Sequence, residues 1–157
     1  MFELIDEVLN ICRPLFASAE VTLNPINCER KNLFLLADRK RCKQVLLNLV
    51  SNAVKFTPQG GQLNVAYHTS SVGLEIRVAD SGVGVPAEAL ERVFERYEQA
   101  RLPVNQNAVG TGLGLALVKN IMSLHQGKAW ASVPGLMGKG TTFHVLFPNE
   151  RIVDVIG

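Results

Sequence analysis

The feature that most constrains the fold of this chain is a helical pattern with two asparagines on one face. Three glycine-rich segments follow it. Asn48 and Asn52 stand four residues apart in RCKQVLLNLVSNAVKF, and DSGVGV, GTGLGL and GKGTTF follow in that order. Apolar residues recur at three- and four-residue intervals, which predicts a helix over 39–56 capped by Asp38. Glycines between helices and strands allow loops to approach that helix closely.

Helical and strand patterns alternate irregularly along the chain. Spacing of apolar residues predicts helices over 2–18, with a kink or an end near Pro14, over 86–97 and over 113–125. Alternation predicts strands at 20–27, 33–37, 62–69, 73–80, 128–133 and 141–147. Residues 98–111 have no period and are expected to form a mobile lid. This order predicts an α/β fold of the α+β two-layer kind, with helices covering one face of a mixed sheet.

Length and composition favour one globular domain over residues 1–157. The formal charge of +2 and the lack of a basic tract argue against nucleic acid as the main ligand. Cys12, Cys28 and Cys42 have no zinc or disulfide spacing and are expected to be thiols in a reducing compartment. No apolar stretch approaches a membrane span, so we expect a cytoplasmic domain without direct membrane contact. We also expect it to be part of a longer protein, such as the cytoplasmic part of a membrane-bound sensor.

The two asparagines are candidate ligands of a metal. Positions four apart share a helix face, so Asn48 and Asn52 can present their amides toward one point, and Lys55 can reach the same place. An amide oxygen suits Mg²⁺, and a lysine offers a charge for phosphate oxygens. Alternatively, both amides are ordinary exposed polar groups of a helix.

Asp80 is a candidate for reading a nucleotide base. It ends the strand pattern LEIRVAD, where a carboxylate can accept a hydrogen bond from an amino group such as that of adenine. Gly82 and Gly84 follow and would let the base approach the backbone. Asp-Ser-Gly is also common turn chemistry, and this alternative remains open.

The segments GTGLGL and GKGTTF are candidates for phosphate and base contacts. Gly110, Gly112 and Gly114 precede a helix, whose N-terminal amides favour phosphate. The segment is neither a Walker loop, because Leu115 and Ala116 follow its last glycine, nor a dinucleotide fingerprint, because its glycine spacing differs. Thr141 and Thr142 open the last strand, where a hydroxyl can lie near the base.

The ordered set NLVSNAVKF, DSGVGV, VFERYEQ, GTGLGL and GKGTTF resembles the conserved boxes of the sensor histidine kinases. These belong to the ATPase superfamily that includes gyrase B, the ATP-driven heat-shock chaperones and MutL. The resemblance extends from about residue 2 to residue 148. It implies a Bergerat fold that binds ATP and Mg²⁺ beneath a mobile lid.

The resemblance also implies roles for individual residues. Asn52 would coordinate Mg²⁺ with support from Asn48, Lys55 would reach the phosphates, and Asp80 would bind the adenine amino group. The further nucleotide-binding residues that it implies are Gly82, Gly84, Tyr97, Gly110, Thr111, Gly112, Leu113, Gly114, Leu115, Thr141 and Thr142. Phe94 and Tyr97 would anchor the lid.

Asn48 separates two reactions within the superfamily. Relatives that hydrolyse ATP have a glutamate at this position, and an amide cannot act as that general base. The resemblance therefore implies transfer of the γ-phosphoryl group of ATP to a protein histidine, with Asn48, Asn52 and Lys55 as the catalytic residues.

The expected partners follow from what this chain lacks. His68, His125 and His144 are not followed by an acidic residue, so structural roles are expected, and the acceptor would belong to a separate dimerisation domain. A response regulator receiver domain would accept the phosphoryl group next. The isolated chain is expected to bind ATP without phosphorylating itself.

The lid departs from the family pattern. Val109 replaces a glycine, and Gln106 and Asn107 stand where an arginine is often found, although Arg96 or Arg101 could substitute. A pseudokinase or an anti-sigma-like binding module that uses ATP only to set a partner surface is the alternative. A free-standing ATPase is a third possibility.

Overall fold

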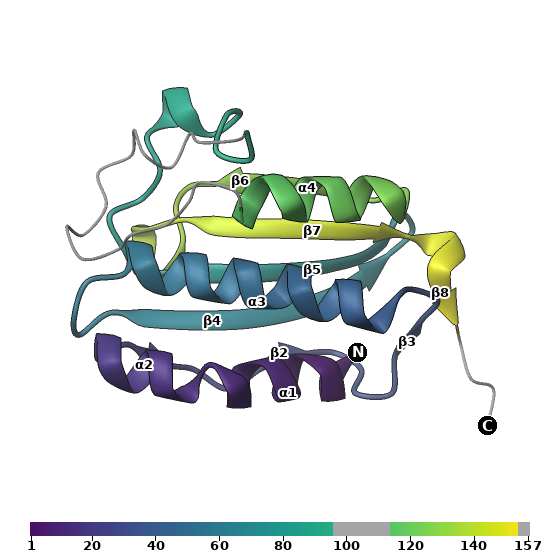
Figure 1. Ribbon diagram of the computed structural model, residues 1–157, viewed down its shortest axis with the longest axis horizontal. Coiled ribbons are helices and arrows are strands. Elements are labelled where there is room, and N and C mark those ends of the chain that lie inside the picture. Colours follow the sequence, from purple (N-terminus) through teal and green to yellow (C-terminus); the bar gives the residue numbers. More distant parts are fainter. Residues whose placement is uncertain (96–113, 154–157) are drawn as a thin grey trace.

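The chain forms two layers, a mixed sheet and a set of helices on one of its faces (Figure 1). The computed structural model describes residues 1–95 and 114–153. The central strands are β4 (Gln62–Ser70), β5 (Gly73–Asp80), β7 (Thr142–Pro148) and β6 (Lys128–Ser132), each antiparallel to its neighbour. β1 (Thr22–Leu23) and β2 (Asn27–Cys28) both pair in parallel with β4 and form the opposite edge of the sheet from β6.

The helices lie side by side across the sheet in the order α1, α3, α4 (Figure 1). They are α1 (Phe2–Ile11), α2 (Arg13–Ala19), α3 (Arg39–Phe56) and α4 (Gly114–Leu124). Pro14 lies in the first turn of α2, so the expected helix over 2–18 is divided at Cys12. α3 lies between α1 and α4 and packs against both.

Local chemistry fixes the two ends of α3. The Asp38 side chain accepts a hydrogen bond from the Arg41 backbone N–H at 3.0 Å, which satisfies one of the free donors at the helix start. At the other end the Thr57 hydroxyl donates to the Ala53 carbonyl oxygen at 2.8 Å. Between these ends, Val45, Leu49 and Ala53 are buried against the sheet, as their spacing predicts.

Three parts of the fold differ from the sequence-based expectation. The single strand expected over 20–27 is divided into the short strands β1 and β2. Over 86–95 the chain forms one 3-10 turn, η1 (Ala87–Ala89), followed by further turns, and no α-helix. β3 (Phe34–Leu35) leaves the main sheet and pairs with β8 (Ile152–Val153), a strand that the sequence patterns did not predict. At two residues, β8 is too short for alternation to reveal it.

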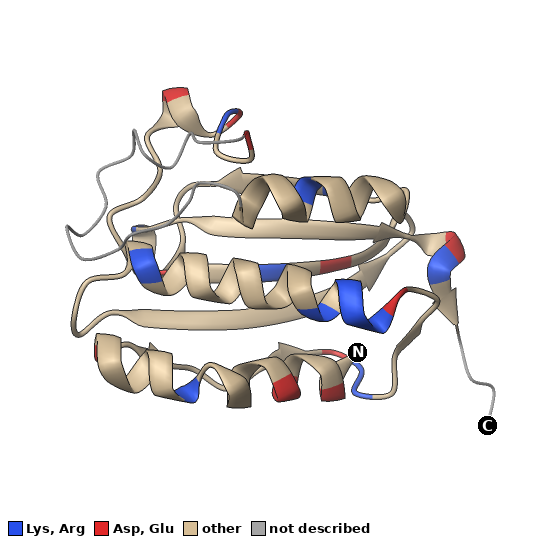
Figure 2. Cartoon of the chain, in the orientation of Figure 1, with Lys and Arg blue, Asp and Glu red and all other residues tan. Residues whose placement is uncertain are grey.

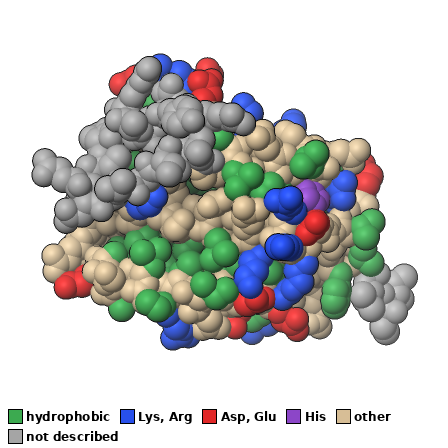
Figure 3. Space-filling model, viewed as in Figure 1, with side chains coloured by type: hydrophobic (Ala, Val, Ile, Leu, Met, Phe, Trp, Pro, Cys, Tyr) green, Lys and Arg blue, Asp and Glu red, His purple; other side chains and the backbone are tan. Residues whose placement is uncertain are grey.

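Acidic and basic residues both occur on the helices that cover the sheet (Figure 2). Basic side chains gather over the N-terminal half of α3, beside acidic ones (Figure 3). There Glu7 of α1 forms ion pairs with Arg39 at 2.6 Å and with Lys43 at 2.7 Å. Among residues 1–95 and 114–153, no helix combines the length and the apolar character that crossing a membrane requires.

Candidate functional site

Asp80 lies at the centre of the candidate site. It is the last residue of β5 and its exposed fraction is 0%. Its Oδ1 atom accepts hydrogen bonds from the backbone N–H groups of Gly82 at 2.9 Å and Thr141 at 3.2 Å. Its Oδ2 atom is buried and has no hydrogen-bond partner among the described residues. Burial raises the pKa of Asp80 to about 6, although the two backbone donors act in the opposite direction.

Glycines allow the backbone to close tightly around this carboxylate. A Cβ atom at Gly140 would lie 2.1 Å from the Asp80 carbonyl oxygen and 2.6 Å from Oδ1. A Cβ atom at Gly135 would lie 2.1 Å from the same carbonyl oxygen, and one at Gly82 would lie 2.1 Å from the Phe56 carbonyl oxygen. Any side chain at these positions would therefore push the surrounding segments away from Asp80.

Thr141 joins two of these segments. Its backbone N–H donates to Asp80, and its buried hydroxyl oxygen accepts a hydrogen bond from the Val85 N–H at 2.9 Å. Thr142 is half-buried, and its hydroxyl donates to the Pro134 carbonyl oxygen at 3.3 Å. The structure thus brings Thr141 to Asp80, whereas Thr142 contacts the loop before β7.

A cavity of about 600 Å³ opens beside these glycines. Its walls come from residues 83–86, from Val133 and Pro134, and from residues 138–140. The side chains of this lining are apolar except that of Lys139, and the glycines present their backbone. Gly84 and Gly140 face each other, because a Cβ at Gly84 would lie 3.2 Å from the Gly140 carbonyl oxygen. This volume falls within the range of roughly 300–1,000 Å³ that is usual for small-molecule sites.

The second half of the candidate site lies between α3 and α4. Asn48 and Lys55 are half-buried and Asn52 is 4% exposed, all on one face of α3. A Cβ atom at Gly114, the first residue of α4, would lie 3.5 Å from the Asn48 Oδ1 atom. The start of α4 therefore lies against the amide of Asn48, whose buried Nδ2 atom has no hydrogen-bond partner in the described part of the chain.

A family model described as histidine kinase-, DNA gyrase B-, and HSP90-like ATPase matches residues 37–151. The chain belongs to this ATPase family. The match contains Asn48, Asn52, Asp80 and the glycines around them, so the site described above lies within the region that defines the family.

Curated relatives of this ATPase domain include histidine protein kinases. DivJ of Caulobacter vibrioides is 51% identical over 112 residues, which are 71% of this chain and 18% of DivJ. The chain spans less than a third of the length of the first curated relatives that it matches.

Solved structures support the same assignment. Full-length ShkA in complex with AMPPNP has a TM-score of 0.80 and 28% identity over 94% of this chain and 29% of that one. ThkA in complex with the response regulator protein TrrA has a TM-score of 0.75 and 27% identity over 94% of this chain and 40% of that one. The two-layer fold and the resemblance to the ATP-binding domain of sensor histidine kinases are therefore confirmed.

Several expected site residues of the ATPase domain lie outside the described residues. They are Tyr97, Gly110, Thr111, Gly112 and Leu113, together with the lid positions 96, 101, 106, 107 and 109. Leu115 is described and is buried in the core, so only its backbone remains for a ligand. Phe94, expected as a lid anchor, is buried and packs edge-to-face on Phe143 with ring centroids 6.3 Å apart.

Sequence reasoning missed the contributions of Gly135, Val85 and Lys139. Gly135 follows a proline in a loop with no strand or helix pattern, and Val85 takes part through its backbone N–H. The dipeptide Pro134-Gly135 was the available signal, because it marks a turn, but it does not indicate which carbonyl group the turn approaches.

Proposed function

We propose that this chain is the catalytic ATP-binding domain of a two-component sensor histidine kinase. In this proposal it holds ATP and gives the γ-phosphoryl group to a histidine of a separate dimerisation domain. The observation that carries the proposal is the amide of Asn48 beside the start of α4. This position, next to a helix N-terminus that favours phosphate, holds a group that cannot activate water.

Asp80 supplies the base contact in this proposal. Its Oδ2 atom is buried without a partner among the described residues and can accept a hydrogen bond from the adenine amino group. Thr141 and Gly82 hold the other oxygen, which fixes the direction of the carboxylate. The cavity beside Gly84 and Gly140 has room for the purine.

Asn52 and Lys55 supply the phosphate side of the site. No group of three or more His, Cys, Asp or Glu side chains suited to a metal exists within the described ranges. A neutral amide oxygen fits Mg²⁺, which takes most of its remaining ligands from water and from the phosphates. Bound Mg²⁺ would neutralise charge on the transferred phosphoryl group, Asn52 would hold the ion with support from Asn48, and Lys55 would bind phosphate oxygens.

The histidines of the chain are already engaged in contacts that favour structural roles. Nε2 of His125 accepts a hydrogen bond from the Asp38 N–H at 3.2 Å. His144 lies 2.6 Å from Glu75 and 2.7 Å from the Ser132 hydroxyl, and burial lowers its pKa. His68 lies 3.2 Å from Glu75. These contacts support an acceptor histidine outside this domain.

The receiver domain of a response regulator is the proposed partner after phosphotransfer. The solved complex of ThkA with TrrA is a histidine kinase bound to a response regulator protein, and its kinase shares the fold of this chain. We also propose a cytoplasmic location for the domain, since ATP and receiver domains are cytoplasmic.

The test is phosphotransfer in a mixture of this domain, its cognate dimerisation domain and γ-labelled ATP with Mg²⁺. We expect acid-labile label on the dimerisation domain and almost no phosphate release by the isolated ATPase domain. Asn52→Ala should lose the label, and Asn64→Ala, an exchange of the same type on β4, should keep it. ATP binding without any label under every metal condition would instead support a pseudokinase or an anti-sigma-like binding module.

A further inference from the structure

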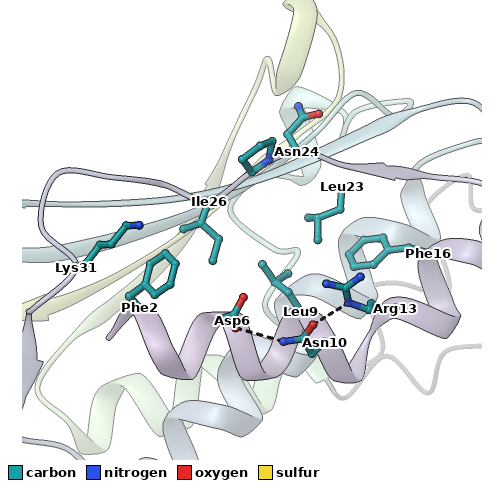
Figure 4. Close-up of a pocket in the computed structure, with 11 residues that line it drawn as sticks. Phe2, Asp6, Leu9, Asn10, Arg13, Phe16, Leu23, Asn24, Ile26 and Lys31 are labelled. Atoms are coloured by element: carbon teal, nitrogen blue, oxygen red, sulfur yellow. Dashed lines mark hydrogen bonds between the residues drawn. The ribbon is translucent and has the colours of Figure 1, made fainter.

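A second cavity, of about 640 Å³, lies between the first helices and the edge of the sheet. Phe2 and Leu9 of α1 and Phe16 of α2 line one side, and Leu23 and Ile26 line the other, on β1 and the link to β2. Figure 4 shows these apolar side chains directed toward one another across the cavity. We call this cavity the edge groove.

The edge groove is separate from the candidate nucleotide site. It lies beside α1, whereas the candidate nucleotide site lies around the end of β5 and between α3 and α4 (Figure 1). Its volume is close to that of the cavity beside Gly84, which is about 600 Å³. A groove of this size with an apolar floor and a few polar groups has the general character of a small-molecule site.

The polar groups of the edge groove favour an anion. Arg13 donates from Nε to the Asn10 Oδ1 atom at 2.7 Å, and Asn10 in turn donates to Asp6 at 3.3 Å. This chain of contacts holds the guanidinium group while its terminal nitrogens make no hydrogen bond to another described residue. A guanidinium held in this way presents parallel N–H groups that match a carboxylate or a phosphate.

Lys31 adds a second positive charge at the other end of the edge groove (Figure 4). Its Nζ atom lies 5.0 Å from the centroid of the Phe2 ring. Asp6 is the one carboxylate among the residues that line the groove, and it is engaged by Asn10. The side chains that line the groove therefore carry two positive charges and one negative charge.

The sheet edge itself is poorly suited to an added peptide strand. β1 and β2 are two residues long each, and Pro25 between them has no backbone N–H to donate. An occupant therefore gains little from strand pairing and depends on apolar contact and on charge.

We propose that the edge groove binds a free small anionic amphiphile, a molecule with an apolar chain or ring and one carboxylate or phosphate group. The apolar part lies on Phe2, Leu9 and Leu23. The anionic group is bound by Arg13.

The test uses ¹⁵N-labelled chain titrated with sodium decanoate or decyl phosphate below their micelle concentrations and followed by NMR. We expect saturable shifts of the amides that line the edge groove, with little change around Asp80 and Gly140. Decyltrimethylammonium, which has the same chain and the opposite charge, should bind at least about fivefold more weakly.

Two variants separate charge recognition from general apolar binding. Arg13→Gln should weaken decanoate binding about tenfold, because a charge-assisted hydrogen bond is lost, and should not weaken decyltrimethylammonium binding. Arg41 is also an exposed arginine, but it lies on α3, away from the lining of the edge groove. Arg41→Gln should therefore have no effect on the binding of either probe.

Four results with the soluble probes would overturn the proposal. They are no saturable shift with either anion, shifts centred on the nucleotide site, equal binding of the cationic probe, and decanoate binding that Arg13→Gln leaves unchanged. Binding seen with phosphatidylglycerol vesicles but not with monomeric decanoate would overturn it as well, because the surface would then recognise a membrane.

Discussion

The carboxylate of Asp80 accepts a hydrogen bond from the backbone N–H of Thr141, a residue 61 positions further along the chain, at 3.2 Å. This bond joins the end of β5 to the start of β7. Because the second carboxylate oxygen is buried without a partner among the described residues, the bond also fixes which oxygen remains for a ligand.

Asp80→Asn is expected to weaken ATP binding at least about tenfold. An amide in this position either turns its N–H₂ group toward the adenine amino group or loses the acceptor that Gly82 and Thr141 need. Calorimetry with ATP measures the change. Asp6→Asn, an exchange of the same type on the exposed face of α1, should bind ATP as the unaltered chain does. Equal affinity in Asp80→Asn would mean that Asp80 is only a turn residue.

The stability of the protein should depend on the protonation of Asp80. Burial raises the pKa of Asp80 from 3.8 to about 6, so the native state binds more protons than the unfolded state between these values. The contribution of Asp80 to the free energy of unfolding is fully present below the pKa of the unfolded state. It is lost as the pH rises through about 6, and the loss amounts to up to roughly 3 kcal/mol. Urea unfolding from pH 4 to 7 should show this loss in the unaltered chain and not in Asp80→Asn. Parallel pH profiles of the two proteins would contradict it.

Gly140→Ala should be much more harmful than Gly138→Ala. Both glycines have positive φ, +79 and +75, so both substitutions cause similar backbone strain, about 1–2 kcal/mol. Only at Gly140 would the new Cβ atom lie 2.1 Å from the Asp80 carbonyl oxygen, whereas at Gly138 nothing lies within 4 Å. We expect Gly140→Ala to lose at least about 2 kcal/mol more in unfolding free energy. Similar losses in the two variants would show that the close approach to Asp80 has no energetic importance.

Asn48→Glu is expected to increase phosphate release by the isolated chain at least about tenfold. A carboxylate beside the start of α4 can take a proton from water, which the amide cannot do. Asn48→Gln has the same length without the base and is the matched control in a steady-state phosphate assay. The interpretation of Asn48 fails if both variants release phosphate at one rate.

The sequence predicted the central elements well because their signals are local. Asp38, the apolar spacing and Thr57 define α3, and strict alternation defines β4 and β5. The pairing of Phe34 with Val153 joins two-residue strands that are far apart in sequence, and no local pattern predicts such a contact. Asp80 could be proposed from the sequence because its signal, a strand pattern followed by glycines, is local. The close approach of Gly135 to the Asp80 carbonyl oxygen could not, because it joins distant segments.

The position of β7 between β5 and β6 has a consequence for synthesis of the chain. The segment that supplies Thr141 and leads into β7 comes late in residues 37–151, the region that the family model matches, so it leaves the ribosome after α3 and β5. A nascent chain that ends before β7 has α3 with both asparagines and β5 with its carboxylate, but the segment that orients the carboxylate has not yet been made. Nucleotide binding should therefore begin only when the domain is almost fully translated.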